Sequence, residues 1–198
     1  MSNHPKNHPK KGSVLKVGPV RERRDIDRIK AVLADQPRNL ALFMPGINTN
    51  LRASDLVGLK TGQVMTLTPE QSFEIREKKT GKLRRLTLNK GALKAVHEWI
   101  RIGGLKHDDP LFLSQRNWKA LTVSSVNRLV RSWCKAAGLK GQFGSHSLRK
   151  TWGYHAWKAG IDLPRLMVIF NHSSQKQTLD YLCIQAEEIQ EVYLKVEL

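Results

Sequence analysis

The chain has 198 residues, 40% of them hydrophobic, which is enough to bury the core of one domain. It carries 34 Lys and Arg residues against 17 Asp and Glu residues, and the formal charge of +17 favours nucleic acid as a partner over anionic membrane or the ribosome. No run of about 18 apolar residues is present, so we expect no membrane span and no membrane partner. The N-terminus lacks a secretory signal and only two cysteines occur, which favours a cytoplasmic, nucleoid-associated protein.

The positive charge is concentrated at the start of the chain. Residues 1–24 carry seven Lys and Arg residues and a single acid, which is a net charge of +6. The tandem Asn-His-Pro-Lys repeat there contains prolines that oppose helix formation, so we predict a disordered basic arm over residues 1–21. This arm would follow DNA phosphates, and the alternative is a tail that only increases solubility. The lysines expected to contact DNA are Lys6, Lys10 and Lys11.

Apolar residues at helical spacing predict one mainly α-helical domain over residues 22–185. Thr122 is the expected N-cap and Gly138 the expected stop signal of one helix, and Gly160 is the expected stop signal of another. A polar stretch over residues 171–178 is expected to connect the last two apolar segments of the domain. The predicted helices span residues 22–35, 38–44, 91–102, 123–137, 146–159 and 162–170, with a short helix that closes near Gly58.

The hydrophobic period changes between residues 63 and 88. Alternating segments at 72–76 and 85–88 flank a hairpin turn signal at Thr80-Gly81, and the apolar run 64–67 precedes them. We therefore predict a small three-stranded antiparallel sheet, which makes the fold α+β. The lysines that cluster at the predicted hairpin tip are Lys78, Lys79 and Lys82.

His146 and Arg149 stand three residues apart at the start of a predicted helix, so their side chains share one face. A guanidinium grips an oxyanion through two N–H groups, and an imidazole carries a proton. Phosphate chemistry needs both functions. In a basic protein the same pair is more often a solvated helix face, so the rest of the chain must decide between the two.

Three further segments supply residue types that serve the same chemistry. Arg52 lies at the entrance of the short helix, where free N–H groups favour anions, and Lys79 precedes the hairpin turn. His172 is followed nine residues later by Tyr181. Together with the segment His146-Ser147-Leu148-Arg149, this ordered set resembles the tyrosine recombinases, also called phage-type integrases.

The resemblance covers residues 25–198 and implies the catalytic-domain fold of that family, which is mainly α with a small antiparallel sheet. It implies a site-specific recombinase that cuts and rejoins DNA through a 3′-phosphotyrosine intermediate, in integration, excision or inversion. That intermediate keeps the bond energy, so no ATP, metal or other cofactor is expected. The catalytic residues that the resemblance implies are Arg52, Lys79, His146, Arg149, His172 and Tyr181.

The resemblance also implies the role of each residue. Tyr181 attacks the phosphodiester, and two arginines, Arg52 and Arg149, clamp its non-bridging oxygens. A lysine on the hairpin protonates the leaving 5′-oxygen, and alignment by the turn favours Lys79 over its neighbours. The first histidine assists proton transfer at the tyrosine, and the second hydrogen-bonds the phosphate. Asp55 is expected to orient the first arginine.

Two features depart from the family pattern. Asn171 stands where the family usually has glycine, and asparagine tolerates the left-handed backbone better than other non-glycine residues. Most members carry a helical core-binding domain before the catalytic domain, whereas a short basic arm stands there in this sequence, as in the short fimbrial-inversion recombinases. The remaining expected contacts with double-stranded DNA are Lys78, Lys82 and Lys150.

Residues 186–198 are predicted to form an acidic tail helix whose apolar stripe must be buried somewhere. In the family such a tail docks on a neighbouring subunit, which implies a homotetramer on DNA, with accessory DNA-bending proteins as further partners. The alternative is that the tail packs on its own domain. The residues of the stripe are Ile189, Val192, Tyr193 and Val196.

Two other functions are compatible with this reading. A type IB topoisomerase-like enzyme that relaxes DNA shares the residue set, although the short tail and the lack of a second clamping region argue against it. A DNA-binding regulator that keeps a recombinase shell without catalysis is the other, and the intact residue set argues against that.

Overall fold

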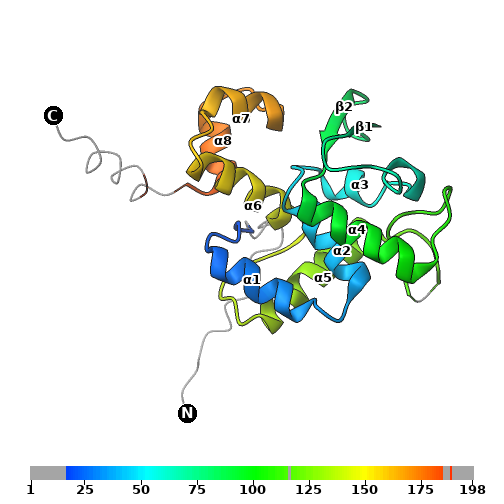
Figure 1. Ribbon diagram of the computed structural model, residues 1–198. Helices are drawn as coiled ribbons and strands as arrows, with labels where there is room; N and C mark the ends of the chain where they lie inside the picture. Colours follow the sequence, from blue (N-terminus) through cyan, green and yellow to red (C-terminus); the bar gives the residue numbers. More distant parts are fainter. Residues whose placement is uncertain (1–16, 116, 185–187, 189–198) are drawn as a thin grey trace, which may run out of the picture.

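The structure is a computed structural model that describes residues 17–115, 117–184 and 188. The described part is mainly helical and includes one small antiparallel sheet (Figure 1). The helices are α1 (Arg23–Val32), α2 (Pro37–Gly46), α3 (Ala53–Leu56), α4 (Lys90–Gly103), α5 (Val123–Ala136), α6 (Ser145–Lys158), α7 (Leu163–Phe170) and α8 (Gln175–Leu182). The strands are β1 (Ser72–Arg76) and β2 (Leu83–Thr87), preceded by the 3-10 turn η1 (Thr61–Gln63).

Helix α2 is the centre of the larger hydrophobic core. It packs against α3, α4 and α6, and its residues Leu42 and Phe43 are almost completely buried. The Phe43 ring meets the ring of Trp133 on α5 edge to face, with 6.1 Å between centroids. On α4, Trp99 donates its indole N–H to the Leu111 carbonyl at 2.7 Å. This core is the base from which α3 and α6 present the candidate site residues.

A second, smaller core holds α7 and α8 against α6. Its fully buried residues are Leu166, Phe170 and Leu182. Gly153 on α6 permits the close approach, because a Cβ there would lie 2.4 Å from the Phe170 ring and 2.6 Å from Leu182. In Figure 1 the α7–α8 pair stands beside α6, apart from the α2–α4 core. The positions of His172 and Tyr181 therefore depend on this contact.

The predicted helices correspond to α1, α2, α4, α5, α6 and α7, with ends that shift by a few residues. Thr122 caps α5 as expected, because its hydroxyl accepts the Ser125 amide at 3.1 Å. Gly138 and Gly160 follow α5 and α6 with φ values of 73° and 88°, a backbone conformation that ends a helix and favours glycine. The N-cap and glycine signals in the sequence were therefore sufficient to place these helix ends.

The prediction of a third strand is wrong, because the sheet of the described residues has two strands, with β1 antiparallel to β2. The run 64–67 instead follows η1, and the amides of Val64 and Met65 both donate to the Thr61 carbonyl at 3.0 Å. These local hydrogen bonds use the donors that a strand would give to its neighbour. Val64 is fully buried, so the apolar run does mark a core segment with a different backbone.

Residues 17–21, the described part of the predicted arm, pack along α6. The Val20 amide donates to Oγ1 of Thr151 at 2.8 Å, and the Val20 carbonyl lies 3.0 Å from Nε2 of His155. Arg21 forms an ion pair with Glu188 at 3.2 Å. The prediction of disorder is wrong for this short segment, because α6 satisfies its backbone groups. The arm lysines Lys6, Lys10 and Lys11 lie outside the described residues.

The predicted tail helix also lies outside the described residues, apart from Glu188. Tyr154 on α6 donates its hydroxyl hydrogen bond to Glu188 at 2.6 Å, and Lys158 lies 3.6 Å from the same carboxylate.

Within the described ranges, no helix combines the length and apolar composition that a membrane crossing requires.

Gly153→Val should destabilise the domain, because its side chain would collide with Phe170 and Leu182. Overpacking of a filled core costs about 1–3 kcal/mol, and we expect that loss in the free energy of unfolding measured by urea denaturation. Gly18→Ala is the control, since a Cβ at Gly18 meets nothing within 4 Å. Equal stability of the two variants would show that the close approach of α6 to α7 and α8 is not required.

Candidate active site

Arg52 precedes α3 as its N-cap residue, and two carboxylates hold its side chain. Its Nη1 donates to Oε2 of Glu77 at 2.7 Å and lies 4.0 Å from Oδ2 of Asp55. Asp55 therefore lies where an orienting residue is expected, but Glu77 is the closer partner. The Arg52 side chain keeps 17% of its surface exposed, so the guanidinium is fixed and still partly accessible.

Glu77 is the carboxylate on which two arginines converge. It is buried, and it accepts from Arg52, from Nη1 of Arg84 at 3.2 Å and from the Thr80 hydroxyl at 2.7 Å. Burial by itself would raise the pKa of Glu77, but these contacts outweigh it and lower the pKa to about 2. Sequence analysis missed both Glu77 and Arg84, because an alternating strand pattern does not show which charged residue at a hairpin end turns inward.

Arg149 lies on α6 and is only 5% exposed. Its Nη2 donates to the Phe170 carbonyl at 3.2 Å, and its guanidinium carbon lies 5.0 Å from the centroid of the Phe170 ring. Nε is buried without a hydrogen-bond partner in the described part of the chain. Burial lowers the pKa of Arg149 to about 10, and repulsion by Arg52 and Arg84 acts in the same direction. A buried cation with an unused donor favours the arrival of an anion.

Asn171 ends α7 in the left-handed conformation, with φ 55° and ψ 52°. The expectation that asparagine supports this backbone is thus confirmed. The His172 amide then donates to the Met167 carbonyl at 2.9 Å, which closes the helix. The His172 imidazole stacks on Phe170 with 5.2 Å between centroids, and its Nδ1 lies 3.1 Å from Oγ1 of Thr178. Burial and the nearby arginines lower the pKa of His172, which favours the neutral form of the ring.

Tyr181 lies in α8, a helix that begins at Ser174 within the predicted polar stretch. The stretch was expected to be a connection, but the Ser174 hydroxyl accepts the Gln177 amide at 3.1 Å and starts a helix. The half-buried Tyr181 ring lies 5.1 Å from the His172 ring between centroids. Burial raises the pKa of the Tyr181 phenol, and the two site arginines, Arg149 and Arg52, partly offset this rise.

His146 and Lys79 border this cluster from exposed positions. His146 lies in the first turn of α6, and Lys79 lies in the turn between β1 and β2. Partial desolvation lowers the pKa of His146, and the nearby charges of Lys150, Arg149 and Lys79 lower it further. The structure thus brings Arg149, His172 and Tyr181 into direct contact around Phe170, with the other three predicted residues near them.

Lys150 differs from the expectation that it contacts DNA. It is 4% exposed, and its ammonium donates to the Val17 carbonyl at 2.8 Å and lies 3.3 Å from the Cys183 thiol. The same ammonium lies 5.0 Å from the centroid of the Tyr181 ring. Its place on α6, next to Arg149, turns it into the interior. Lys150 therefore supports the site in this structure and does not line the surface.

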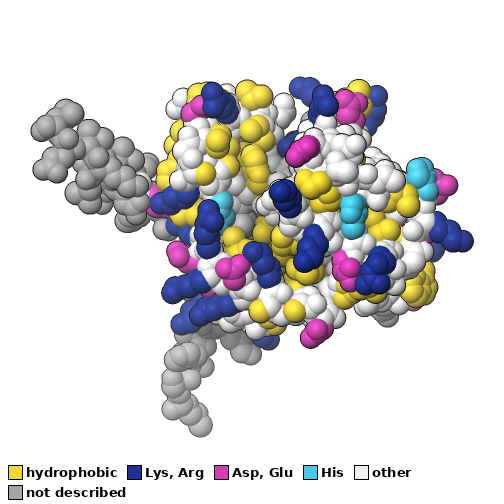
Figure 2. All heavy atoms as spheres, in the orientation of Figure 1, with side chains coloured by type: hydrophobic (Ala, Val, Ile, Leu, Met, Phe, Trp, Pro, Cys, Tyr) yellow, Lys and Arg dark blue, Asp and Glu magenta, His cyan; other side chains and the backbone are white. Residues whose placement is uncertain are grey.

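Of the lysines expected to contact DNA that the structure describes, Lys78 and Lys82 are exposed at the hairpin tip. On the face shown in Figure 2, Lys and Arg side chains gather at this tip and around α1, with acidic side chains between them. The α1 region owes part of this mixed charge to local pairs such as Lys30 with Asp27, whose side chains are 2.9 Å apart. The hairpin tip is thus the strongest described candidate for a phosphate contact beside the site.

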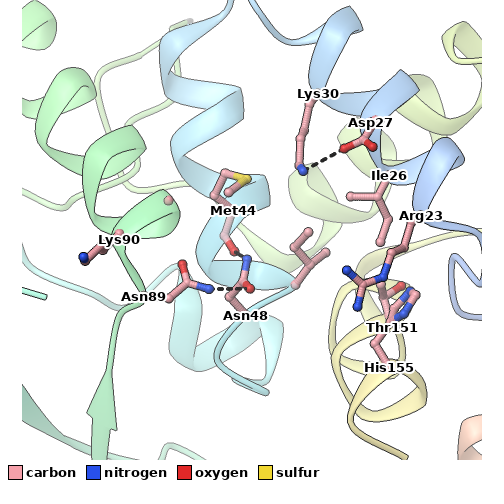
Figure 3. A pocket seen from close by; sticks show the side chains of 12 residues that line it. Arg23, Ile26, Asp27, Lys30, Met44, Asn48, Asn89, Lys90, Thr151 and His155 are labelled. Carbon is pink, nitrogen blue, oxygen red and sulfur yellow. Dashed lines mark hydrogen bonds and ion pairs between the residues drawn. The ribbon is translucent and has the colours of Figure 1, made fainter. Parts of the chain in front are cut away.

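A cavity of about 640 Å³ lies away from these residues, between α1, α2, the start of α4 and α6 (Figure 3). Lys30 and Asp27 form an ion pair at one side of it, and Asn89 donates to Asn48 at 2.8 Å at the other. None of the six predicted catalytic residues lines this cavity. The predicted catalytic residues therefore form a separate cluster of charged and aromatic side chains, away from this cavity.

The fold and the cluster together define a class. Two fixed guanidinium groups, neutral imidazoles and a half-buried phenol are the parts that transfer of a phosphoryl group to a tyrosine needs. The chain belongs to the phage integrase family, whose model matches residues 22–188.

The relatives agree with this membership. The chain is 32% identical over 178 residues to the probable integrase/recombinase YoeC of Bacillus subtilis (strain 168), covering 89% of this chain and 95% of the relative. It is 25% identical to the tyrosine recombinase XerC of Haemophilus influenzae (strain 86-028NP), covering 85% of this chain and 59% of the relative.

Solved structures of tyrosine recombinases share the fold. The XerA recombinase matches with a TM-score of 0.74 and 22% identity over 95% of this chain and 66% of that one. The XerH site-specific recombinase, solved bound to a palindromic difH substrate after cleavage, matches with a TM-score of 0.71 and 20% identity, over 87% of this chain and 51% of that one. The chain thus spans nearly all of the Bacillus relative and about half to two thirds of the others.

Asn171→Val should destabilise the turn that carries His172, whereas Asn171→Gly should be tolerated. A β-branched residue resists the left-handed backbone at φ 55°, and the expected loss in the free energy of unfolding is about 1–2 kcal/mol. Glycine adopts this conformation without strain and serves as the matched control. Urea denaturation measures both variants. If the valine variant is as stable as the glycine variant, the left-handed turn is not a constraint.

Proposed function

We propose that the protein is a site-specific DNA recombinase that cuts and rejoins DNA through a 3′-phosphotyrosine at Tyr181. The observation that carries the proposal is the contact of the Tyr181 ring with His172, beside the buried guanidinium of Arg149, in a chain of the phage integrase family. An anion placed between these groups would meet the unused Nε donor of Arg149 and a phenol at once.

In the proposed step, Oη of Tyr181 attacks the scissile phosphorus and the bond from phosphorus to the 5′-oxygen breaks. The leaving 5′-oxygen takes a proton from Lys79, and the phenol loses its own proton in the same step. Arg52 and Arg149 neutralise the non-bridging oxygens, so charge stabilisation and positioning lower the barrier. Rejoining reverses these transfers when a 5′-hydroxyl of another strand attacks the phosphotyrosine. No ATP, metal or other cofactor enters this scheme.

The two imidazoles suit different parts of the step. His146 has a lowered pKa, so it is neutral at pH 7 and has a lone pair that can accept the phenolic proton. This help matters because burial raises the pKa of Tyr181, which keeps the free phenol protonated. His172 is held between Phe170 and Thr178, which suits a hydrogen bond to a fixed phosphate oxygen.

The proposed partner is double-stranded DNA, contacted by Lys78 and Lys82 at the hairpin tip and by the basic arm lysines. Exchange between two duplexes requires several active sites, so we propose a homotetramer on DNA. In it the tail over residues 186–198 would give up contacts with its own domain, such as that of Glu188 with Tyr154, and dock on a neighbouring subunit. Accessory DNA-bending proteins and a cytoplasmic, nucleoid-associated location belong to the same proposal. Among the similar structures, XerH was solved bound to its difH substrate.

Tyr181→Phe should bind DNA normally and form no covalent adduct, because it lacks only the attacking oxygen. The measurement is incubation with a nicked suicide substrate, followed by denaturing electrophoresis to detect protein-linked DNA. Tyr154→Phe is the matched control, since it removes a phenol that hydrogen-bonds Glu188 on the same domain. An adduct at full yield from Tyr181→Phe would overturn the assignment, and relaxation of supercoiled DNA without strand exchange would indicate a topoisomerase-like activity.

Arg149→Lys should slow adduct formation by about 30- to 1000-fold, because the loss of a fixed donor to a developing oxyanion raises the barrier by about 2–4 kcal/mol. Lysine keeps the charge but loses the planar fork of donors. Arg165→Lys is the matched control, since Arg165 pairs with Asp162 on the exposed side of α7.

Adduct formation by the unchanged protein should continue in EDTA. Abolition of the adduct by EDTA with rescue by magnesium would point to a different enzyme class.

A further inference from the structure

The turn between β1 and β2 has two hydrogen bonds to the segment that carries Arg52 and one hydrogen bond within itself. Glu77 accepts from Arg52 at 2.7 Å, and Thr80 donates to the same carboxylate oxygen of Glu77 at 2.7 Å. The Lys78 amide donates to Oδ1 of Asp55 at 2.9 Å. Lys78 and Lys79 are both exposed in this turn, and Lys79 lies between the anchored amide of Lys78 and the anchored hydroxyl of Thr80.

Arg84 extends this anchoring to the backbone that leads into Arg52. Its Nη1 donates to Oε1 of Glu77 at 3.2 Å and lies 3.4 Å from the Asn50 carbonyl, and its Nη2 lies 3.3 Å from the Thr49 carbonyl. Oε2 of Glu77 therefore joins the hairpin directly to Arg52, and Oε1 holds Arg84, which in turn contacts the backbone just before Arg52. A two-stranded hairpin has little stability of its own, so its tip needs such external contacts to hold one position.

The charge of Glu77 also offsets repulsion inside the cluster. Arg52 and Arg84 both act to lower the pKa of Arg149, and Glu77 acts to raise it. With a pKa of about 2, Glu77 remains ionised at every pH at which the protein would work. Removal of this charge would leave three guanidinium groups that repel one another, and the contacts that fix the hairpin would loosen.

Building on the proposed function, we propose that Glu77 is a positioning residue that locks the Lys79 turn onto Arg52, so that the phosphate clamp and the proton donor act on one phosphodiester. Without Glu77, Arg52 still has Asp55 nearby, and Arg84 still has two backbone carbonyls. The hairpin turn, in contrast, keeps only the Lys78 amide bond to Asp55, because its contact with Arg52 and the acceptor of the Thr80 hydroxyl are both lost. The defect should therefore fall mainly on protonation of the leaving 5′-oxygen.

The test compares two suicide substrates, one with the natural 5′-oxygen at the scissile bond and one with a bridging 5′-sulfur. In the second, the bond from phosphorus to sulfur breaks and a thiolate leaves, which needs no proton donor. Glu77→Gln should cleave the oxygen substrate about 10- to 100-fold more slowly. This is the size of effect seen when a metal-ligating side chain loses the hydrogen-bond partner that orients it. The sulfur substrate should largely recover this rate, as it should for Lys79→Ala, while the affinity for DNA stays unchanged.

Glu74→Gln is the matched control, because Glu74 is an exposed acid on β1, the strand that precedes Glu77. This variant should cleave both substrates at the rate of the unchanged protein. A folded Glu77→Gln protein with undiminished cleavage, or with the same defect on both substrates, would overturn the proposal. If Glu77→Gln does not fold, Thr80→Val decides by the same comparison, since it leaves both arginine contacts in place. If the unchanged protein forms no adduct on either substrate, the proposed function fails instead.

Discussion

The buried charge of Arg149 is the constraint on which the rest of the site depends. A guanidinium that is 5% exposed, with no carboxylate at ion-pair distance among the described residues, is unfavourable in the free protein. The lowering of its pKa from 12.5 to about 10 corresponds to a penalty on the order of 3 kcal/mol on the charged form. An arriving phosphate would relieve this penalty. The fold therefore places a cation that stabilises the negative charge developed in the proposed reaction.

Phe170 is the residue that makes this burial tolerable. Its carbonyl accepts from Arg149, its ring lies against the same guanidinium, and the same ring contacts both His172 and Tyr181. A cation over an aromatic face recovers part of the lost hydration, most effectively where water is excluded. Phe170 is also a residue of the smaller core and packs against Gly153. The geometry of the site therefore depends on the packing of that core.

Motifs in the sequence predicted which side chains meet, but not what holds them. The ordered set of His146, Arg149, His172 and Tyr181 resembles that of the tyrosine recombinases, and this resemblance made the cluster an expectation before its geometry was known. Glu77 gave no such sign, because its role depends on a contact with Arg84 across the hairpin. Charge alone was equally uninformative for the lysine beside Arg149, since helical phase at an unknown packing angle decides whether a side chain faces solvent. The false third strand has a related cause, because burial was evident and the local hydrogen bonds were not.

The interior position of Lys150 joins two parts of the chain that sequence analysis treated separately. Its ammonium bridges the Val17 carbonyl and the Cys183 thiol, and Arg21 donates to the Cys183 carbonyl. Cys183 follows α8 in the left-handed conformation, two residues after Tyr181. Residues 17–21 are therefore part of the support of α8, the helix that carries Tyr181. Because Lys150 is only 4% exposed, loss of its carbonyl partner would leave a buried ammonium donor unsatisfied, which would cost stability at the end of α8.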